Sequence, residues 1–124
     1  MKKRILVVDD EPALTRMIKL TLEQTGLYEV RTENLGRMAI AAAREFRPDL
    51  MLLDVMMPGM PGSDIAAQLQ EDPELRAIKF VFLTAIVTKE EALVSSGQFG
   101  GHTFVAKPIS ADDLCRVVEK HLRQ

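Results

Sequence analysis

Residues 50–54 read LMLLD, an unbroken apolar run that ends in an aspartate. Three further segments have the same form, an apolar run followed at once by polar residues: 5–8 (ILVV), 80–83 (FVFL) and 104–106 (FVA). A strand buried on both faces is continuously apolar, and such strands are typical of parallel sheets covered by helices. The four runs therefore predict the central strands of an α/β fold.

Polar residues stand where each of these predicted strands ends. They are Asp9 and Asp10 after the first run, Asp54 in the second, Thr84 after the third and Lys107 after the fourth. In an open parallel sheet the carboxyl ends of the strands share one edge, and ligands bind there. We therefore expect three carboxylates, a hydroxyl and an ammonium to meet in one crevice, although they are far apart in the sequence.

The segments between the runs have helical periodicity and helix end signals. A helix is predicted over 12–26, because it opens with a proline and closes at a glycine. A short strand is predicted at 28–32. A second helix is predicted from 35 to about 48, with Asn34 as its candidate cap.

Three more helices complete the predicted alternation. They are 62–72, a segment around 89–94 whose end the sequence does not define, and a last helix that starts at Ser110. Ser110 and Asp113 form a capping-box pattern, in which a hydroxyl caps the first turn. Five rounds of strand and helix with right-handed crossovers predict a doubly wound parallel α/β sheet in one domain.

Composition excludes several classes of function. The chain has 124 residues, a net charge of −2 and no basic block, so no nucleic-acid surface of its own and no direct nucleic-acid partner is expected. No apolar run approaches the roughly 18 residues of a membrane span, so no membrane association is expected. The single Cys115 cannot form an internal disulfide, which favours a reducing, cytoplasmic location.

Four motifs occur in order, each at a predicted strand end: VVDDEP at 7–12, PDLMLLDVMMPGMPG at 48–62, LTA at 83–85 and KP at 107–108. Alone, an Asp-Asp or Lys-Pro pair says little, because such residues also cap helices and form turns. Together they resemble the response-regulator receiver domain of bacterial two-component signalling, of the chemotaxis-regulator type. The resemblance spans the whole chain. It implies one receiver domain, 1–124, with no output domain, as a flavodoxin-like three-layer sandwich with strand order 2-1-3-4-5 and five helices.

The resemblance implies a role for each site residue. Asp54 is the expected phosphoacceptor, and its partner is a histidine kinase or phosphotransfer protein. The expected cofactor is Mg²⁺, with Mn²⁺ as an alternative. Asp10 and Asp54 would bind the ion directly, Asp9 through a water, and Met56 through its backbone carbonyl. Thr84 and Lys107 would contact the phosphoryl oxygens, and the Lys107–Pro108 peptide bond is expected to be cis.

The resemblance also implies a switch. Thr84 would sense the phosphate, and Phe104 on the fifth strand would turn inward in response. The surface formed by the fourth helix, fifth strand and fifth helix would then bind an unidentified downstream protein. Two apolar residues that flank the expected phosphoryl site, Met56 and Ile86, predict slow loss of the phosphate.

Three alternatives remain open at this stage. The chain can be the receiver part of a longer regulator with a DNA-binding or enzymatic output. It can be an aspartyl-phosphate phosphatase of the haloacid-dehalogenase type, although Met56 stands where those enzymes need a second aspartate. It can also be a receiver that binds partners without phosphorylation. We favour a signalling switch that assists its own phosphorylation and dephosphorylation over a conventional enzyme.

Overall fold

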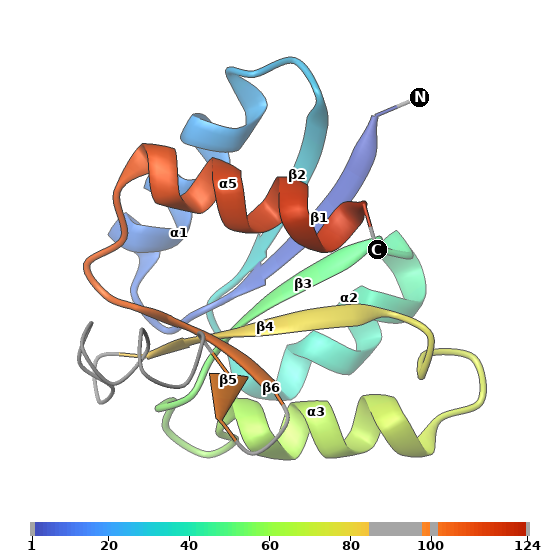
Figure 1. Ribbon diagram of the computed structural model, residues 1–124. Coiled ribbons are helices and arrows are strands. Elements are labelled where there is room, and N and C mark those ends of the chain that lie inside the picture. The colour runs from blue at the N-terminus through green and yellow to red at the C-terminus, as the bar shows by residue number, and fades with distance from the viewer. Residues whose placement is uncertain (1, 85–97, 100–101, 124) are drawn as a thin grey trace.

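The computed structural model describes residues 2–84, 98–99 and 102–123. Within them one six-stranded sheet has the order β2-β1-β3-β4-β6-β5 (Figure 1). The pairs β1–β2, β1–β3, β3–β4 and β4–β6 are parallel, and β5–β6 is antiparallel. The strands are β1 (Lys3–Val8), β2 (Tyr28–Glu33), β3 (Leu50–Asp54), β4 (Lys79–Thr84), β5 (Gln98–Phe99) and β6 (His102–Ala106).

The five parallel strands confirm the predicted order, with β6 as the fifth of them. Strand β5 was not predicted. It has two residues and adds an antiparallel edge to β6. So short a segment carries no hydrophobic periodicity from which a strand could be inferred.

Helices lie on both faces of the sheet (Figure 1). The described residues form the α-helices α1 (Pro12–Glu23), α2 (Ala39–Phe46), α3 (Gly62–Glu71) and α5 (Ala111–Leu122). The helix predicted around 89–94 lies outside the described residues. No described helix has the length and apolar character needed to cross a membrane.

The side chains of β1 alternate between two cores, as the pleat of a strand requires. Ile5 and Val7 pack in a core with side chains of α1 and α5. Leu6 and Val8 pack in a second core with side chains of α2 and α3. All four are fully buried. The sheet is therefore the middle of three layers, which explains why its strands read as continuous apolar runs.

The start of α2 differs from the sequence prediction. A 3₁₀ turn, η1 (Gly36–Met38), precedes the helix, and no side chain caps either element. Asn34 does not act as the cap, because Leu35 is at the N-cap of η1 and Met38 is at the N-cap of α2. The amide nitrogen of Asn34 instead donates hydrogen bonds to residues 9 and 15. The cap predicted for α5 is confirmed: the Ser110 hydroxyl accepts a hydrogen bond of 3.1 Å from the backbone N–H of Asp113.

Candidate functional site

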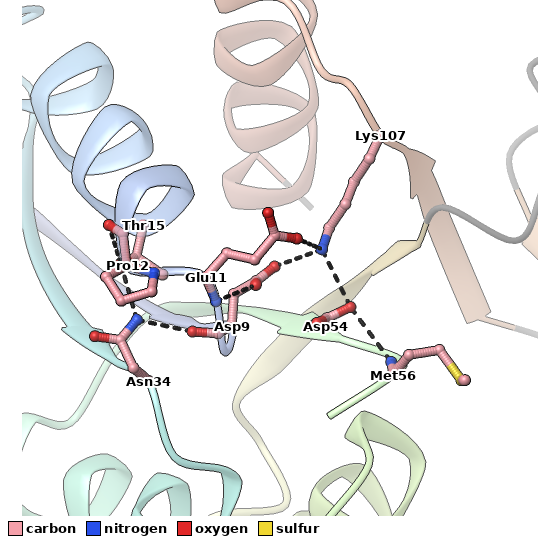
Figure 2. Close-up of polar contacts among 8 residues, drawn as sticks. All are labelled: Asp9, Glu11, Pro12, Thr15, Asn34, Asp54, Met56 and Lys107. Atoms are coloured by element: carbon pink, nitrogen blue, oxygen red, sulfur yellow. Dashed lines mark hydrogen bonds and ion pairs between the residues drawn. The ribbon is translucent and has the colours of Figure 1, made fainter. Parts of the chain in front are cut away.

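The carboxyl edge of the parallel strands brings the predicted site residues together. Asp9 directly follows β1, Asp54 ends β3, Thr84 ends β4 and Lys107 directly follows β6. Figure 2 shows the side chains of Asp9, Asp54 and Lys107 converging on one point. The convergence of side chains expected from the strand ends is therefore present for Asp9, Asp54 and Lys107.

Three carboxylates form a compact acidic cluster. One oxygen from each of Asp9, Asp10 and Asp54 lies within 4.8 Å of the others. Asp9 and Asp54 are buried, with exposed fractions of 0% and 3%, while Asp10 is exposed. The cluster thus has a buried floor and an open side toward solvent.

Backbone groups hold the two buried carboxylates in place. Oδ1 of Asp9 accepts a hydrogen bond of 2.9 Å from the backbone N–H of Glu11. Oδ1 of Asp54 accepts one of 3.3 Å from the backbone N–H of Met56 (Figure 2). These bonds leave each residue a second carboxylate oxygen for other ligands.

Lys107, which directly follows β6, contacts the two buried carboxylates of the cluster. Its Nζ lies 2.7 Å from Oδ2 of Asp9 and 3.3 Å from Oδ1 of Asp54. A weaker contact of 3.5 Å joins it to the exposed side chain of Glu11. Burial works to lower the pKa of Lys107, but the ion pair with Asp9, followed by that with Asp54, outweighs it and raises that pKa. Lys107 is therefore a fixed positive charge at neutral pH.

One ammonium does not compensate three carboxylates. Burial raises the pKa of Asp9, although Lys107 and the Glu11 N–H oppose that shift. Burial, followed by the charge of Asp9, raises the pKa of Asp54 to about 6. Like charges held together in a low-dielectric site disfavour ionisation. The cluster consequently carries an excess of negative charge that a cation would relieve.

The donor set fits a hard divalent ion. The ligand atoms of the cluster are carboxylate oxygens, which Mg²⁺ and Mn²⁺ prefer. Oδ2 of Asp9 is fully buried and accepts no aligned hydrogen bond within the described part of the chain, only the ion pair with Lys107. A buried carboxylate oxygen whose hydrogen-bonding capacity is not filled can accept a further partner, such as a water bound to a metal ion.

Residues of β4 and β6 lie beside the acidic cluster or lead up to it. Thr84 is 1% exposed, and its carbonyl accepts a hydrogen bond of 2.9 Å from the backbone N–H of Lys107. The Lys107–Pro108 peptide bond is cis. Phe104 is half-buried and packs on Phe82, with ring centroids 5.1 Å apart. Ile86 lies outside the described residues.

Phe104 also borders an open space. A cavity of about 230 Å³ lies between the ring and α3, and its lining includes Val55 and Phe82. The ring of Phe104 therefore has space to change its orientation on the side of the sheet that α3 covers.

Gly62 determines how closely α3 approaches the site. A Cβ at this position would lie 2.4 Å from the carbonyl oxygen of Asp54. Its backbone N–H donates a hydrogen bond of 3.3 Å to the carbonyl of Val55. The first turn of α3 is thus packed directly against the backbone that carries Asp54.

Two contacts of this site were missed by the sequence analysis. They are the ion pair of Glu11 with Lys107, and the hydrogen bonds from Asn34 to the Asp9 carbonyl and to the Thr15 hydroxyl of α1. The signal for the second was available: Thr15 is a polar residue at a buried position of α1, in register with Ile18 and Leu22.

Known proteins match this chain along almost its whole length. The response regulator receiver domain matches residues 5–119. The chain belongs to the response-regulator receiver domain family. Receiver domains act in two-component signalling as switches, so the haloacid-dehalogenase alternative is not supported.

Individual relatives agree with this assignment. The chain is 38% identical over 124 residues to the DNA-binding response regulator MtrA of Mycolicibacterium smegmatis, covering 100% of this chain and 52% of MtrA. It is 42% identical over 116 residues to the response regulator PleD of Caulobacter vibrioides, covering 92% of this chain and 24% of PleD. The chain therefore spans about half of the length of MtrA and about a quarter of the length of PleD.

Solved structures share the fold. A putative response regulator from Chloroflexus aurantiacus superposes with a TM-score of 0.84 at 26% identity, with both chains fully covered. The Vibrio cholerae chemotaxis protein CheY4 superposes with a TM-score of 0.81 at 27% identity, covering 97% of this chain and 98% of CheY4.

Proposed function

We propose that Asp54 accepts a phosphoryl group from a phosphohistidine of a kinase or phosphotransfer protein. The observation that supports this most directly is the position of its carboxylate, at a strand end between an acidic cluster and the Lys107 ammonium. In the reaction a carboxylate oxygen of Asp54 forms a bond to phosphorus, the P–N bond of the donor breaks, and the imidazole nitrogen keeps its electron pair. The product is an aspartyl phosphate.

The cluster of Asp9, Asp10 and Asp54 would hold Mg²⁺, with Mn²⁺ as a substitute. Asp10 and Asp54 would be direct ligands, Asp9 would act through a water, and the carbonyl of Met56 would be a further ligand. The ion supplies charge neutralisation between the carboxylates and the incoming phosphoryl oxygens. The residues 1–124 would act as one receiver unit.

Lys107 and Thr84 would contact the phosphoryl group. Lys107 already lies 3.3 Å from Asp54, so its charge is in place before the phosphoryl group arrives. A preorganised cation stabilises the transition state without reorganisation during the reaction. In this sense the receiver would assist its own phosphorylation. In dephosphorylation a water in the same site would attack phosphorus, the bond to the Asp54 oxygen would break, and inorganic phosphate would leave.

Phe104 would report the phosphorylated state to a partner. When Thr84 moves toward the phosphoryl group, the ring of Phe104 would turn toward the cavity beside α3. Such a change would alter the surface beside β6, the fifth parallel strand, which belongs to the expected partner face formed by the fourth helix, the fifth parallel strand and the fifth helix. A shift from 1:99 to 99:1 needs about 5.5 kcal/mol of differential stabilisation, which several charge-assisted hydrogen bonds can provide.

The downstream partner would bind this face and would lie in another segment or another protein. The relatives named above are longer regulators, one of them named as DNA-binding. The net charge of −2 and the lack of a basic block in the sequence favour a receiver that does not itself bind nucleic acid. Co-purification with and without a phosphoryl mimic would identify the partner.

Intact-mass measurement tests the proposal. The protein is incubated with acetyl phosphate and Mg²⁺, and an adduct of one phosphoryl group is expected. The adduct should disappear in Asp54→Asn and when EDTA removes the metal. Asp49→Asn is the matched control, because Asp49 lies at the other end of β3, where it accepts a hydrogen bond from Arg4. No adduct on the wild type, or an adduct that survives Asp54→Asn, would overturn the proposal.

A further inference from the structure

The loop that carries Asp9 and Asp10 is tied to β2 by the side chain of a residue outside the cluster. The Nδ2 group of Asn34 donates a hydrogen bond of 2.8 Å to the carbonyl oxygen of Asp9 and one of 3.1 Å to the hydroxyl of Thr15 (Figure 2). Because the Asp9 carbonyl can only accept, the amide nitrogen and not the amide oxygen must face it. An amide nitrogen has two hydrogens, and both are used.

The peptide groups on both sides of Asp9 are held by two consecutive residues of the same segment. The backbone N–H of Asp9 donates to the carbonyl of Glu33 at 3.1 Å, and the carbonyl of Asp9 accepts from Asn34. Its Oδ1 is held by the N–H of Glu11. Of the polar atoms of Asp9, Oδ2 alone lacks an aligned hydrogen bond within the described residues, and this atom faces Lys107.

Thr15 extends this connection into α1. Its hydroxyl is buried with the side chain, at 2% exposure, and donates a hydrogen bond of 3.1 Å to the carbonyl of Pro12. The same oxygen accepts from Asn34. Asn34 and Thr15 together therefore fix both ends of the short loop between β1 and α1, which contains Asp9, Asp10 and Glu11.

We propose that Asn34, supported by Thr15, is a positioning residue for the divalent cation: it fixes the backbone of Asp9 so that the carboxylates of the loop are preorganised for the ion. This inference rests on the proposed function, because it assumes that the cluster binds Mg²⁺. Partners that orient the ligands of a metal, without touching the metal, typically contribute 10- to 100-fold to affinity. Since Asn34 acts through a backbone group, an effect near the lower end is expected.

The variants separate positioning from charge. Asn34→Leu removes both hydrogen-bond donors at similar side-chain volume. It should raise the dissociation constant for Mg²⁺ about tenfold. Asn34→Asp adds a negative charge close to the cluster, which by Coulomb attraction alone would tighten Mg²⁺ binding. It also turns a carboxylate oxygen toward the Asp9 carbonyl, so the positioning role requires weaker binding.

Thr15 provides a second, independent variant pair. Thr15→Val keeps the shape and removes the hydroxyl, so Mg²⁺ binding should weaken several-fold. Thr15→Ser keeps the hydroxyl and should restore near wild-type affinity. Asn34 and Thr15 share one hydrogen bond, which either single variant already removes. The double variant Asn34→Leu/Thr15→Val should therefore lose less Mg²⁺ affinity than the product of the two single losses.

The matched control is Thr25→Val. Thr25 has the same kind of hydroxyl at the other end of α1, where it donates to the carbonyl of Leu22 at 2.7 Å and accepts from the N–H of Leu27. Its loss destabilises the same helix without touching the acidic loop. Its Mg²⁺ affinity should stay within twofold of the wild type.

Isothermal titration with MgCl₂ measures the affinities, and thermal unfolding by circular dichroism measures the stability of each metal-free variant. The inference is overturned by an unchanged affinity in Asn34→Leu, by tighter binding in Asn34→Asp, or by an equal loss in Thr25→Val. If the wild type itself binds no Mg²⁺, the metal part of the proposed function fails as well. An intact wild-type site with an unaffected Asn34→Leu overturns the positioning role alone.

Discussion

The Lys107 ammonium lies 2.7 Å from Oδ2 of Asp9, closer than it lies to Asp54, the expected phosphoacceptor. Both side chains of the pair are largely buried, at 14% and 0% exposure. A buried ion pair contributes little net stability compared with an apolar pair, but removal of one partner leaves the other charge uncompensated. Lys107 therefore limits how much the charges of the acidic cluster reduce the folding stability of the metal-free protein.

The variant Lys107→Met should destabilise the metal-free protein at pH 7 by about 3 kcal/mol, because Asp9 and Asp54 lose their only described cationic neighbour. At pH 5 the loss should be smaller, since protonation neutralises the carboxyl of Asp54, whose pKa is about 6. Urea unfolding at the two pH values measures both. A second change, Asp9→Asn, should restore part of the stability at pH 7. An equal loss at both pH values would contradict this account.

Asp54→Asn should stabilise the metal-free protein. The folded pKa of Asp54, about 6, lies above the ordinary value of 3.8, so the folded state binds more protons than the unfolded state between these values. Stability is then lost as the pH rises from about 4 to about 6, and the variant should not show this loss. The expected gain at pH 7 is on the order of 1 to 3 kcal/mol.

Mg²⁺ provides the control for this prediction. A ligand that binds only the folded state raises its stability, so excess Mg²⁺ should stabilise the wild type more than Asp54→Asn. Thermal unfolding in buffers from pH 4 to pH 8, with MgCl₂ or with EDTA, measures both effects. A wild-type pH profile that coincides with that of Asp54→Asn in EDTA would refute the charge argument.

Gly62→Ala should impair both stability and phosphorylation. Its new Cβ would meet the Asp54 carbonyl oxygen at 2.4 Å, so either α3 or the end of β3 must shift. Overpacking of this kind costs about 1 to 3 kcal/mol, and the displaced carboxylate should react more slowly with acetyl phosphate. Ser63→Ala, one residue further along α3 at an exposed position, is the control and should stay within about 0.5 kcal/mol of the wild type.

Met56→Asn should shorten the lifetime of the aspartyl phosphate. The Met56 side chain is 64% exposed, two residues after Asp54, so it can be exchanged without repacking, and as an apolar group it offers no hydrogen bond to water near the site. An amide at this position can hydrogen-bond an attacking water. Loss of the phosphate, followed by intact mass after removal of acetyl phosphate, should be several-fold faster. Met57→Leu, an apolar exchange at a buried neighbour, should leave the rate unchanged; a rate in Met56→Asn no faster than in this control would count against the prediction.

The sequence predicted the strand ends well and the loops less well. The apolar runs before Asp9, Asp54 and Thr84 predicted their strands to within two residues at each end, because burial on both faces leaves a continuous signal. Asn34 was assigned to a helix cap from local propensity alone. In the fold Asn34 lies before the N-cap position, and its amide nitrogen donates to the Asp9 carbonyl and the Thr15 hydroxyl, both remote in sequence.

The sequence by itself determined the fold class, the family and the set of groups at the carboxyl edge, because parallel strands bring their ends together whatever the loops do. Only the tertiary structure decided how those groups share their contacts. It places Lys107 against Asp9 as well as Asp54, packs Gly62 against the Asp54 backbone and turns Asn34 toward the Asp9 carbonyl. These are distances between atoms far apart along the chain, and no local pattern of residues contains them.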